Sequence, residues 1–189
     1  MLDDIKLIHQ KDSADALGIA AKTGDQLRKE FDLAPLNFPI NNVVYAGMGG
    51  SALAAVLAQT WPGFSVPFTL VRDYTLPTFV NERTLVMVCS YSGNTEEALS
   101  ALDDARKKNA KVVVLAGGGA LMERARAEVL PFILLPKAAQ PRYAVLYNLR
   151  AIVDILSKAK LTDGDRAHAA LNLAATHIEK AAESWLPTV

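Results

Sequence analysis

Residues 85–89 read Leu-Val-Met-Val-Cys, a run that is apolar at every position. Four other short runs have the length and composition of strands: 43–46, 68–71, 112–116 and 132–135. Strands that are apolar on both faces are typical of parallel sheets covered by helices on each side. Helical stretches separate the runs, at 51–59, 95–108 and 120–128. The alternation predicts an α/β fold, an open, mostly parallel five-stranded sheet with helices on both faces.

The two ends of the chain are expected to be helical. Apolar residues at helical spacing predict one helix over 12–32, which ends before Pro35. Beyond Pro141 the pattern predicts a helical C-terminal segment, with helices over 142–158 and 163–184.

The composition is that of a folded globular protein, with 51% hydrophobic residues and 20 basic residues balanced by 20 acidic ones. No basic run or basic face stands out, so nucleic acid is not an expected partner. A small anionic metabolite needs only a local site and remains possible. The apolar runs are much shorter than the roughly 20 residues of a membrane span, so no membrane partner is expected.

The single cysteine, Cys89, cannot form an intrachain disulfide, which favours a reducing compartment. The N-terminus lacks the basic and apolar regions of a signal peptide. We therefore expect a cytoplasmic protein.

Unusual loops follow three of the expected strands: Gly47–Ser51, Ser90–Thr95 and Gly117–Gly119. Ligands of open parallel sheets bind at the carboxyl ends of the strands. The first two loops run directly into helices, whose first N–H groups favour an anion. Glycines allow close approach and hydroxyls add donors. If their strands are neighbours, four hydroxyls would converge: Ser51, Ser90, Ser92 and Thr95. This predicts a phosphate site that needs no metal and no cofactor.

Each loop also has a simpler interpretation. Glycines after a strand often make only a tight turn. Asn94 or Thr95 would then only cap the next helix, with Glu97 near its N3 position, and Ser51 would cap the helix that follows it. Two such loops at equivalent strand ends favour a binding site.

A dinucleotide-binding domain is a sharper alternative. Gly47, Gly49 and Ala52 match the pattern G-x-G-x-x-G/A between a strand and a helix. Asp73, at the end of the next strand, stands near the position of a ribose-binding acid. This interpretation gives a Rossmann domain that binds NAD, but it leaves the hydroxyl-rich loop at 90–95 unexplained.

Arg142 lies in the first turn of an expected helix, with Pro141 suited to the first position. A cation at this end of a helix costs about a few tenths of a kcal/mol, which a nearby anion would remove. The alternative is an exposed arginine in solvent. The histidines, His9, His168 and His177, are not spaced as metal ligands and are expected at the surface, so no metal site is predicted.

Three motifs, in order, resemble those of the bifunctional phosphoglucose/phosphomannose isomerases, which are two-domain members of the sugar-isomerase (SIS) superfamily. The motifs are Gly-Met-Gly-Gly-Ser-Ala at 47–52, Ser-Tyr-Ser-Gly-Asn-Thr-Glu-Glu at 90–97 and Gln-Pro-Arg-Tyr at 140–143. The resemblance implies an SIS domain over residues 1–160 and a helical linker over 161–189 toward a second SIS domain. It also implies aldose–ketose isomerisation of glucose 6-phosphate or mannose 6-phosphate to fructose 6-phosphate.

The resemblance assigns roles to individual residues. The hexose 6-phosphate would be held through its phosphate by Gly49, Gly50, Ser51, Ser90, Ser92 and Thr95. Arg142 would be catalytic, because a fixed guanidinium offsets the charge of the enediolate intermediate. In the family the glutamate base, a histidine and a lysine lie in the second domain, and Glu96 and Glu97 do not replace that base.

We therefore expect the substrate-binding part of a hexose-phosphate isomerase, incomplete alone. The alternatives are a non-catalytic sugar-phosphate module and the NAD-binding domain. SIS domains generally pair, so a homodimer or contact with a second SIS domain is expected, and the apolar residues Trp185 and Leu186 suggest a partner surface.

Overall fold

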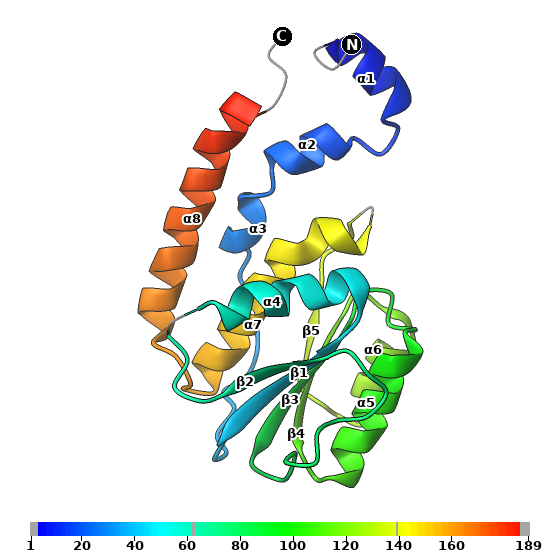
Figure 1. The fold of residues 1–189 in the computed structure, drawn as a ribbon, viewed down its shortest axis with the longest axis vertical. Helices are drawn as coiled ribbons and strands as arrows, with labels where there is room; N and C mark the ends of the chain where they lie inside the picture. The colour runs from blue at the N-terminus through cyan, green and yellow to red at the C-terminus, as the bar shows by residue number, and fades with distance from the viewer. Residues whose placement is uncertain (1–3, 62, 139, 186–189) are drawn as a thin grey trace.

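The computed structural model describes residues 4–61, 63–138 and 140–185. Its centre is a parallel five-stranded sheet with the order β2-β1-β3-β4-β5 (Figure 1). The strands are β1 (Asn42–Gly47), β2 (Phe68–Val71), β3 (Thr84–Ser90), β4 (Lys111–Ala116) and β5 (Phe132–Leu134). All five predicted strands are present within a residue or two of their expected bounds, which confirms the α/β fold class.

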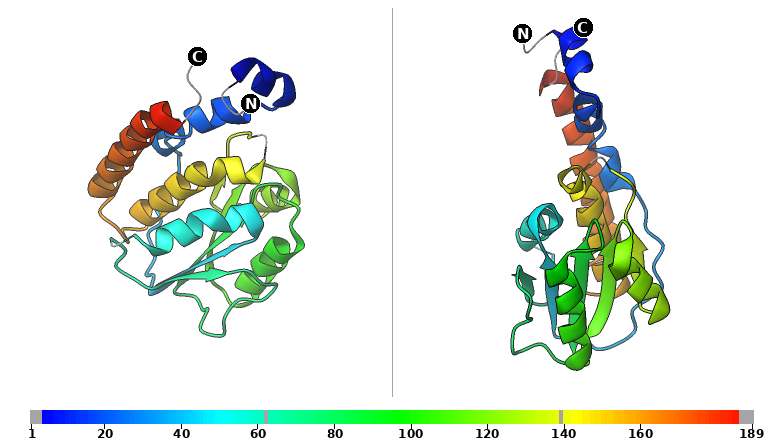
Figure 2. Two further views of the ribbon diagram at one scale, coloured as in Figure 1. Left: turned by 45° about the horizontal axis from the view of Figure 1, so that its top comes forward. Right: turned by 90° about the vertical axis from the view of Figure 1, so that its right-hand side faces the viewer.

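Helices cover both faces of the sheet (Figures 1 and 2). One face carries α4 (Leu53–Gln59) and α7 (Val145–Lys158), with α8 (Gly164–Trp185) packed on α7, and the other carries α5 (Glu96–Lys107) and α6 (Gly119–Ala127). Alternate strand residues enter the two cores: Tyr45 and Met87 pack toward α4 and α7, whereas Val44 and Val88 pack toward α5. The three inner strands β1, β3 and β4 are buried on both sides, so nearly all of their residues can be apolar, whereas the edge strands β2 and β5 are more exposed.

The single helix predicted over residues 12–32 was wrong. The structure has two short helices there instead, α2 (Ala16–Ala21) and α3 (Asp25–Arg28), and a further helix, α1 (Ile5–Lys11), precedes them. Asp15 adopts a left-handed conformation with φ of 51°, and its carboxylate accepts a hydrogen bond from the N–H of Gly18, so a new helix begins there. A Cβ at Gly24 would lie 2.9 Å from the carbonyl oxygen of Ala175, so the chain turns where it approaches α8.

The helical C-terminal segment is confirmed. Helix α8 packs on α3 and α7 through buried residues that include Ala167, Leu171 and Ala175. Trp185 is exposed, and Leu186 lies outside the described residues. The domain boundary at residue 160 stays a prediction. Within the part of the chain that the structure describes, no helix is both long and apolar enough to cross a bilayer.

A buried charge network on Asp154 joins α3, α7 and α8. Its carboxylate accepts hydrogen bonds from Arg150 Nε at 2.9 Å and from the backbone N–H of Phe31 at 3.3 Å, and lies 2.7 Å from His168 Nε2. Arg150 also donates to the Leu27 carbonyl oxygen at 2.9 Å. His168, predicted at the surface, keeps 34% of its side chain exposed, and its ring also meets the Asp154 carboxylate, a contact that the sequence did not predict.

We expect Asp154→Ala to lower the free energy of unfolding by about 3–5 kcal/mol, because it leaves the guanidinium of Arg150 buried without its partner. The matched control is Asp103→Ala, which removes a partly exposed pair with Arg124 and should cost about 0–1 kcal/mol. Urea unfolding of both variants measures the difference. Equal, small losses would show that the network on Asp154 contributes little to stability.

Candidate functional site

The loops after β1 and β3 meet because these strands are neighbours in the sheet. Gly47 at the end of β1 is in register with Cys89 of β3. The first loop forms a short 3-10 helix, η1 (Gly49–Ala52), that leads into α4. The hydroxyl of Ser51 accepts a hydrogen bond from the backbone N–H of Tyr91 at 3.1 Å. The first two motifs, 43 residues apart in the chain from Gly47 to Ser90, are thus joined by a side chain.

The hydroxyl of Ser90 is the centre of the second loop. It lies 2.8 Å from Thr95 Oγ1 and 3.5 Å from Ser92 Oγ, and it accepts the N–H of Gly93 at 3.0 Å. Ser90 is buried, whereas Ser92 is exposed, so the group runs from the end of β3 to the surface. We call Ser51, Ser90, Ser92 and Thr95 the hydroxyl cluster.

The capping interpretation of these side chains was wrong. Thr95 is the N-cap residue of α5, but its side chain makes no capping hydrogen bond and points to Ser90 instead. The carboxamide oxygen of Asn94 accepts the N–H of Ala120 in α6 at 3.0 Å. Helix α4 likewise begins without a side-chain cap. The first turn of α5, next to three hydroxyls, therefore lacks a side-chain acceptor for its N–H groups, the arrangement that favours an anion.

The glycine loop at 117–119 packs against the loop at 90–95. The N–H of Gly117 donates to the Tyr91 carbonyl oxygen at 3.0 Å, and the N–H of Leu121 donates to that of Gly93 at 2.9 Å. Gly93 has a φ of 74°, and a Cβ there would lie 1.7 Å from the carbonyl oxygen of Gly118. The two loops can pack this closely only because both are built from glycine at the contact.

The Gln140–Tyr143 motif lies against the first loop. It forms a 3-10 helix, η2 (Pro141–Ala144), with Pro141 at its first position as predicted. A Cβ at Gly50 would lie 3.1 Å from the backbone nitrogen of Arg142. The side chain of Arg142 is exposed and lines a cavity of about 110 Å³ with Thr23 and Gln26. The structure thus brings the Arg142 backbone to the first loop but does not join its guanidinium to the hydroxyl cluster.

The carboxylates in the first turn of α5, Glu96 and Glu97, lie near Tyr74. Glu96 accepts a hydrogen bond from the Tyr74 hydroxyl at 3.4 Å, and the negative charge of Glu97, with smaller contributions from burial and Glu96, raises the pKa of that tyrosine. Burial raises the pKa of the Cys89 thiol to about 11, so this side chain is neutral at pH 7. Cys89 is fully buried, as predicted for a core residue, and is not placed to act as a nucleophile.

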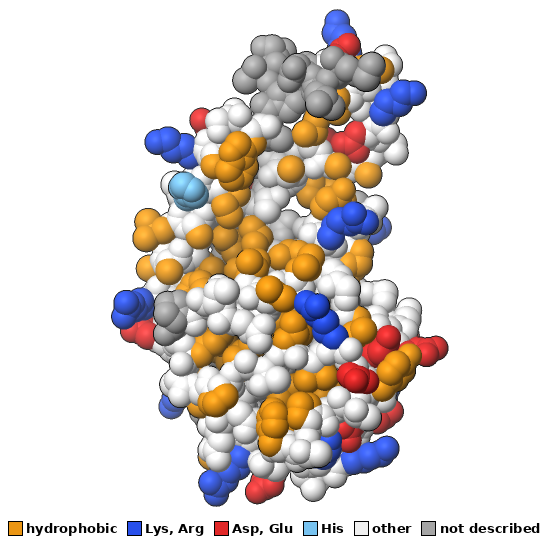
Figure 3. All heavy atoms as spheres, viewed as in Figure 1, with side chains coloured by type: hydrophobic (Ala, Val, Ile, Leu, Met, Phe, Trp, Pro, Cys, Tyr) orange, Lys and Arg blue, Asp and Glu red, His pale blue; other side chains and the backbone are white. Residues whose placement is uncertain are grey.

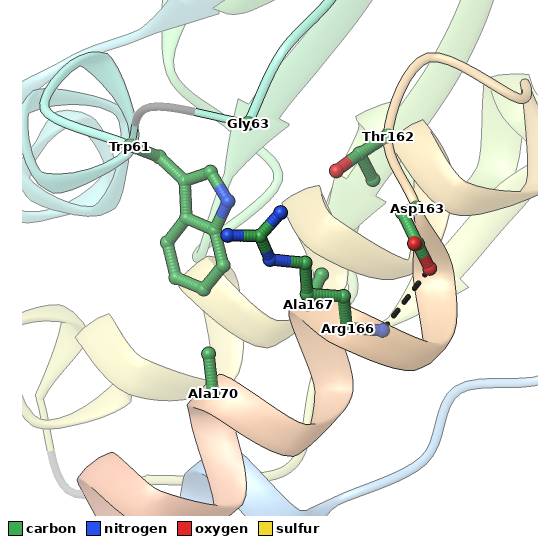
Figure 4. Close-up of a pocket in the computed structure, with 7 residues that line it drawn as sticks. All are labelled: Trp61, Gly63, Thr162, Asp163, Arg166, Ala167 and Ala170. Carbon is green, nitrogen blue, oxygen red and sulfur yellow. Dashed lines mark hydrogen bonds between the residues drawn. The ribbon is translucent and has the colours of Figure 1, made fainter.

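Other polar groups and cavities lie outside the hydroxyl cluster. Asp73, the predicted ribose-binding acid of the dinucleotide interpretation, is exposed and accepts the N–H of Tyr74 at 2.6 Å. A cavity of about 430 Å³ lies at the far end of α4 from the hydroxyl cluster, where the Trp61 ring and the Arg166 guanidinium lie close together (Figure 4). Among the described residues, no group of three or more histidine, cysteine, aspartate or glutamate side chains is placed to hold a metal ion.

Solved structures with a similar fold include two enzymes of sugar-phosphate chemistry. The tagatose-6-phosphate ketose/aldose isomerase of Escherichia coli matches with a TM-score of 0.54 and 17% identity, over 97% of this chain and 53% of that one. The C-terminal domain of glucosamine-fructose-6-phosphate aminotransferase from Francisella tularensis matches with a TM-score of 0.56 and 15% identity, over 93% and 53% of the two chains. The fold is therefore the SIS fold of the phosphosugar isomerases.

Relatives found by sequence are more similar to this chain than the solved structures are. The bifunctional phosphoglucose/phosphomannose isomerases of Aquifex aeolicus and Thermoplasma volcanium are 39% and 36% identical, over 68% and 78% of this chain. A relative named D-glucosamine-6-phosphate 4-epimerase, from Sulfolobus acidocaldarius, is 31% identical over 62% of it. These isomerases are homologues of this chain over most of its length, as the three motifs predict. The matched regions span only 41% and 46% of the two isomerases. No protein-family model matches the chain.

We expect Gly93→Ala to disrupt the packed glycine loops. An alanine there adopts a left-handed conformation at about 1–2 kcal/mol, and its methyl group meets the backbone of Gly118, which adds about 1–3 kcal/mol of overpacking. The control is Gly49→Ala, which has a φ of 51° but nothing within 4 Å of the added Cβ. Urea unfolding compares the two variants, and equal losses would mean that the close contact with Gly118 does not matter.

Proposed function

We propose that this chain is the phosphosugar-binding SIS domain of a hexose-phosphate aldose–ketose isomerase that interconverts glucose 6-phosphate or mannose 6-phosphate with fructose 6-phosphate. The observation that carries the proposal is the hydroxyl cluster beside the uncapped start of α5, in a chain whose relatives are named phosphoglucose/phosphomannose isomerases. The activity of the whole protein is part of this proposal, since the chain spans less than half of those relatives.

The phosphate would lie between the two strand-end loops. The hydroxyls of Ser90, Ser92 and Thr95 would donate to its oxygens from one side, and Ser51 with the backbone of Gly49 and Gly50 would do so from the other. The contacts among these hydroxyls hold them close together before a ligand arrives, which lowers the entropy cost of binding. Hydrogen bonds to a charged group contribute about 1.5–3 kcal/mol each, so several hydroxyls can hold the dianion without a lysine.

The isomerisation moves a proton from C2 of the aldose to C1 through an enediolate, with no change in overall oxidation state. This is why the proposed reaction needs no redox cofactor. Arg142 would offset the developing negative charge if its exposed guanidinium turns toward the sugar. It cannot take the proton, because a guanidinium stays protonated. The base would come from outside the described residues, since Glu96 points to Tyr74.

We propose that the exposed apolar side of α4 contacts another SIS domain, either in a homodimer or as a second domain. Hydrophobic side chains gather on the face of the molecule that carries α4 and α8 (Figure 3), and on α4 they include Leu53, Val56 and Leu57. Exposed apolar groups of this kind are typical of interfaces. Sedimentation equilibrium of the chain distinguishes a dimer from a monomer.

A cytoplasmic location is also proposed, supported by the single free cysteine.

A second candidate follows from the relative named D-glucosamine-6-phosphate 4-epimerase. The domain would then bind an amino-sugar 6-phosphate through the same loops. A non-catalytic sugar-phosphate module is a further possibility, and all three share the phosphate site.

We expect Ser90→Ala to weaken binding of fructose 6-phosphate by about tenfold or more, because it removes the central hydroxyl and one charged hydrogen bond. Asp73→Ala is the control and should leave the affinity unchanged, since Asp73 belongs only to the dinucleotide interpretation. Isothermal titration calorimetry measures both variants. Wild-type affinity in Ser90→Ala would overturn the phosphate site, and NAD binding that is lost in Asp73→Ala would favour the Rossmann interpretation.

We also expect the 189-residue chain to bind a hexose 6-phosphate without isomerising it at a useful rate. A positioned general base typically contributes about 10²–10⁴-fold to such a reaction, and none is in place in the described residues. A coupled assay that converts glucose 6-phosphate to fructose 6-phosphate tests this. Turnover of about 1 s⁻¹ or more, in the ordinary range of enzymes, would show that the chain holds a base of its own.

A further inference from the structure

Two side chains from distant parts of the chain hold the segment that carries Arg142. Its described parts are residues 135–138, after β5, and 140–147, which lead into the first turn of α7. On its N-terminal side, the Tyr91 hydroxyl lies 3.0 Å from the Pro136 carbonyl oxygen and accepts the N–H of Ala138. On its C-terminal side, the Gln26 amide donates to the Tyr143 carbonyl oxygen at 2.6 Å. The segment is therefore attached on both sides of Arg142.

Gln26 also supplies a cap that α7 lacks locally. The N-cap residue of α7 is Ala144, which has no side-chain acceptor for the first N–H groups of the helix. The carbonyl oxygen of the Gln26 side chain accepts the N–H of Tyr147 at 3.2 Å, from 121 residues away. Gln26 is only 6% exposed. A carboxamide is suited to this place because it donates to one backbone group and accepts from the other.

Tyr91 connects the same segment to the hydroxyl cluster. Its backbone N–H donates to the Ser51 hydroxyl at 3.1 Å, and its carbonyl oxygen accepts the N–H of Gly117 at 3.0 Å. Its own hydroxyl reaches the backbone at 136–138. One residue thus fixes the distance between the cluster and the start of the Arg142 segment, while Gln26 fixes the other end.

Between these two attachments the segment touches the first loop. A Cβ at Gly50 would lie 3.1 Å from the Arg142 nitrogen and 3.2 Å from Pro141 Cβ, so the segment leaves little room for a side chain at residue 50. The Arg142 side chain itself is exposed and makes no hydrogen bond or ion pair with any residue in the described ranges. Its place relative to the hydroxyl cluster therefore depends on the backbone, and the backbone depends on Gln26 and Tyr91.

We propose that Gln26 and Tyr91 are positioning residues that set Arg142 at a fixed distance from the phosphate, so that its guanidinium meets an anion at the C1–C2 end of the sugar. The inference rests on the proposed function, because it takes the phosphate to lie in the hydroxyl cluster. It adds two residues that make no contact with substrate and act through the backbone of one segment.

A pair of matched ligands tests the positioning. Glucitol 6-phosphate and 6-phosphogluconate share the phosphate and the open carbon chain, but only the second carries a carboxylate at C1. The ratio of their affinities, measured by calorimetry, therefore reports on Arg142 and cancels the contribution of the phosphate. In the wild type we expect the acid to bind about tenfold or more tightly, the effect of one charged hydrogen bond. Arg142→Gln should bring the ratio close to one.

The variants Gln26→Met and Tyr91→Phe keep the size of each side chain and remove its hydrogen bonds to the segment. We expect each to lower the ratio by about threefold or more while the affinity for glucitol 6-phosphate changes less than about twofold. When combined with Arg142→Gln, neither variant should lower the ratio of affinities further, because the effects of residues that act through one another do not add. Gln59→Met and Tyr74→Phe, at exposed positions, are the controls and should behave as the wild type.

Each other outcome separates this inference from the proposed function. A wild type that binds neither ligand overturns both. A wild-type ratio near one, with both ligands bound, leaves the phosphate site intact and overturns the role of Arg142 together with its positioning. If Gln26→Met and Tyr91→Phe leave the ratio unchanged, or lower the affinity for both ligands equally, these residues serve only stability. That result overturns this inference but not the proposed function.

Discussion

The parallel pairing of β1 with β3 is the constraint on which the site depends. It places Gly47 beside Cys89, so the loops that follow these two residues start next to each other. The hydroxyl of Ser51 can then accept the N–H of Tyr91 across the two loops. Each loop contributes part of the proposed phosphate site. The sheet brings the two loops together, as it does in other folds whose ligands bind at the carboxyl ends of parallel strands.

At the site, polar side chains that would ordinarily cap the next helix form hydrogen bonds with other groups instead. Thr95 stands where a capping side chain is expected, yet its hydroxyl is bonded to Ser90. Asn94 caps the neighbouring helix α6 rather than its own. The start of α5 keeps its positive end free of a side-chain partner, and the close contact of Gly93 with Gly118 holds the loop in this form.

Long-range hydrogen bonds from the helical half of the chain fix the remaining part of the site. Gln26 joins α3 to the start of α7, and Asp154, near the end of α7, accepts the N–H of Phe31 just after α3. The cost of burying these polar side chains is offset because every group has a partner, the Asp154 carboxylate with three. Helix α3 is thus bonded to the backbone next to Arg142, although the two lie far apart in sequence.

The sequence by itself determined the fold class, the five strands, the helical C-terminus and the three motifs of the site, because apolar periodicity and glycine-rich strand ends are local signals. It did not determine where the helix expected over 12–32 breaks, since that depends on the approach of Gly24 to α8. It also gave no sign that Thr95 would turn to Ser90, that Gln26 would cap α7 or that His168 would meet Asp154. Each of these is a hydrogen bond whose partner is chosen by which elements pack together, and only the tertiary structure decides that.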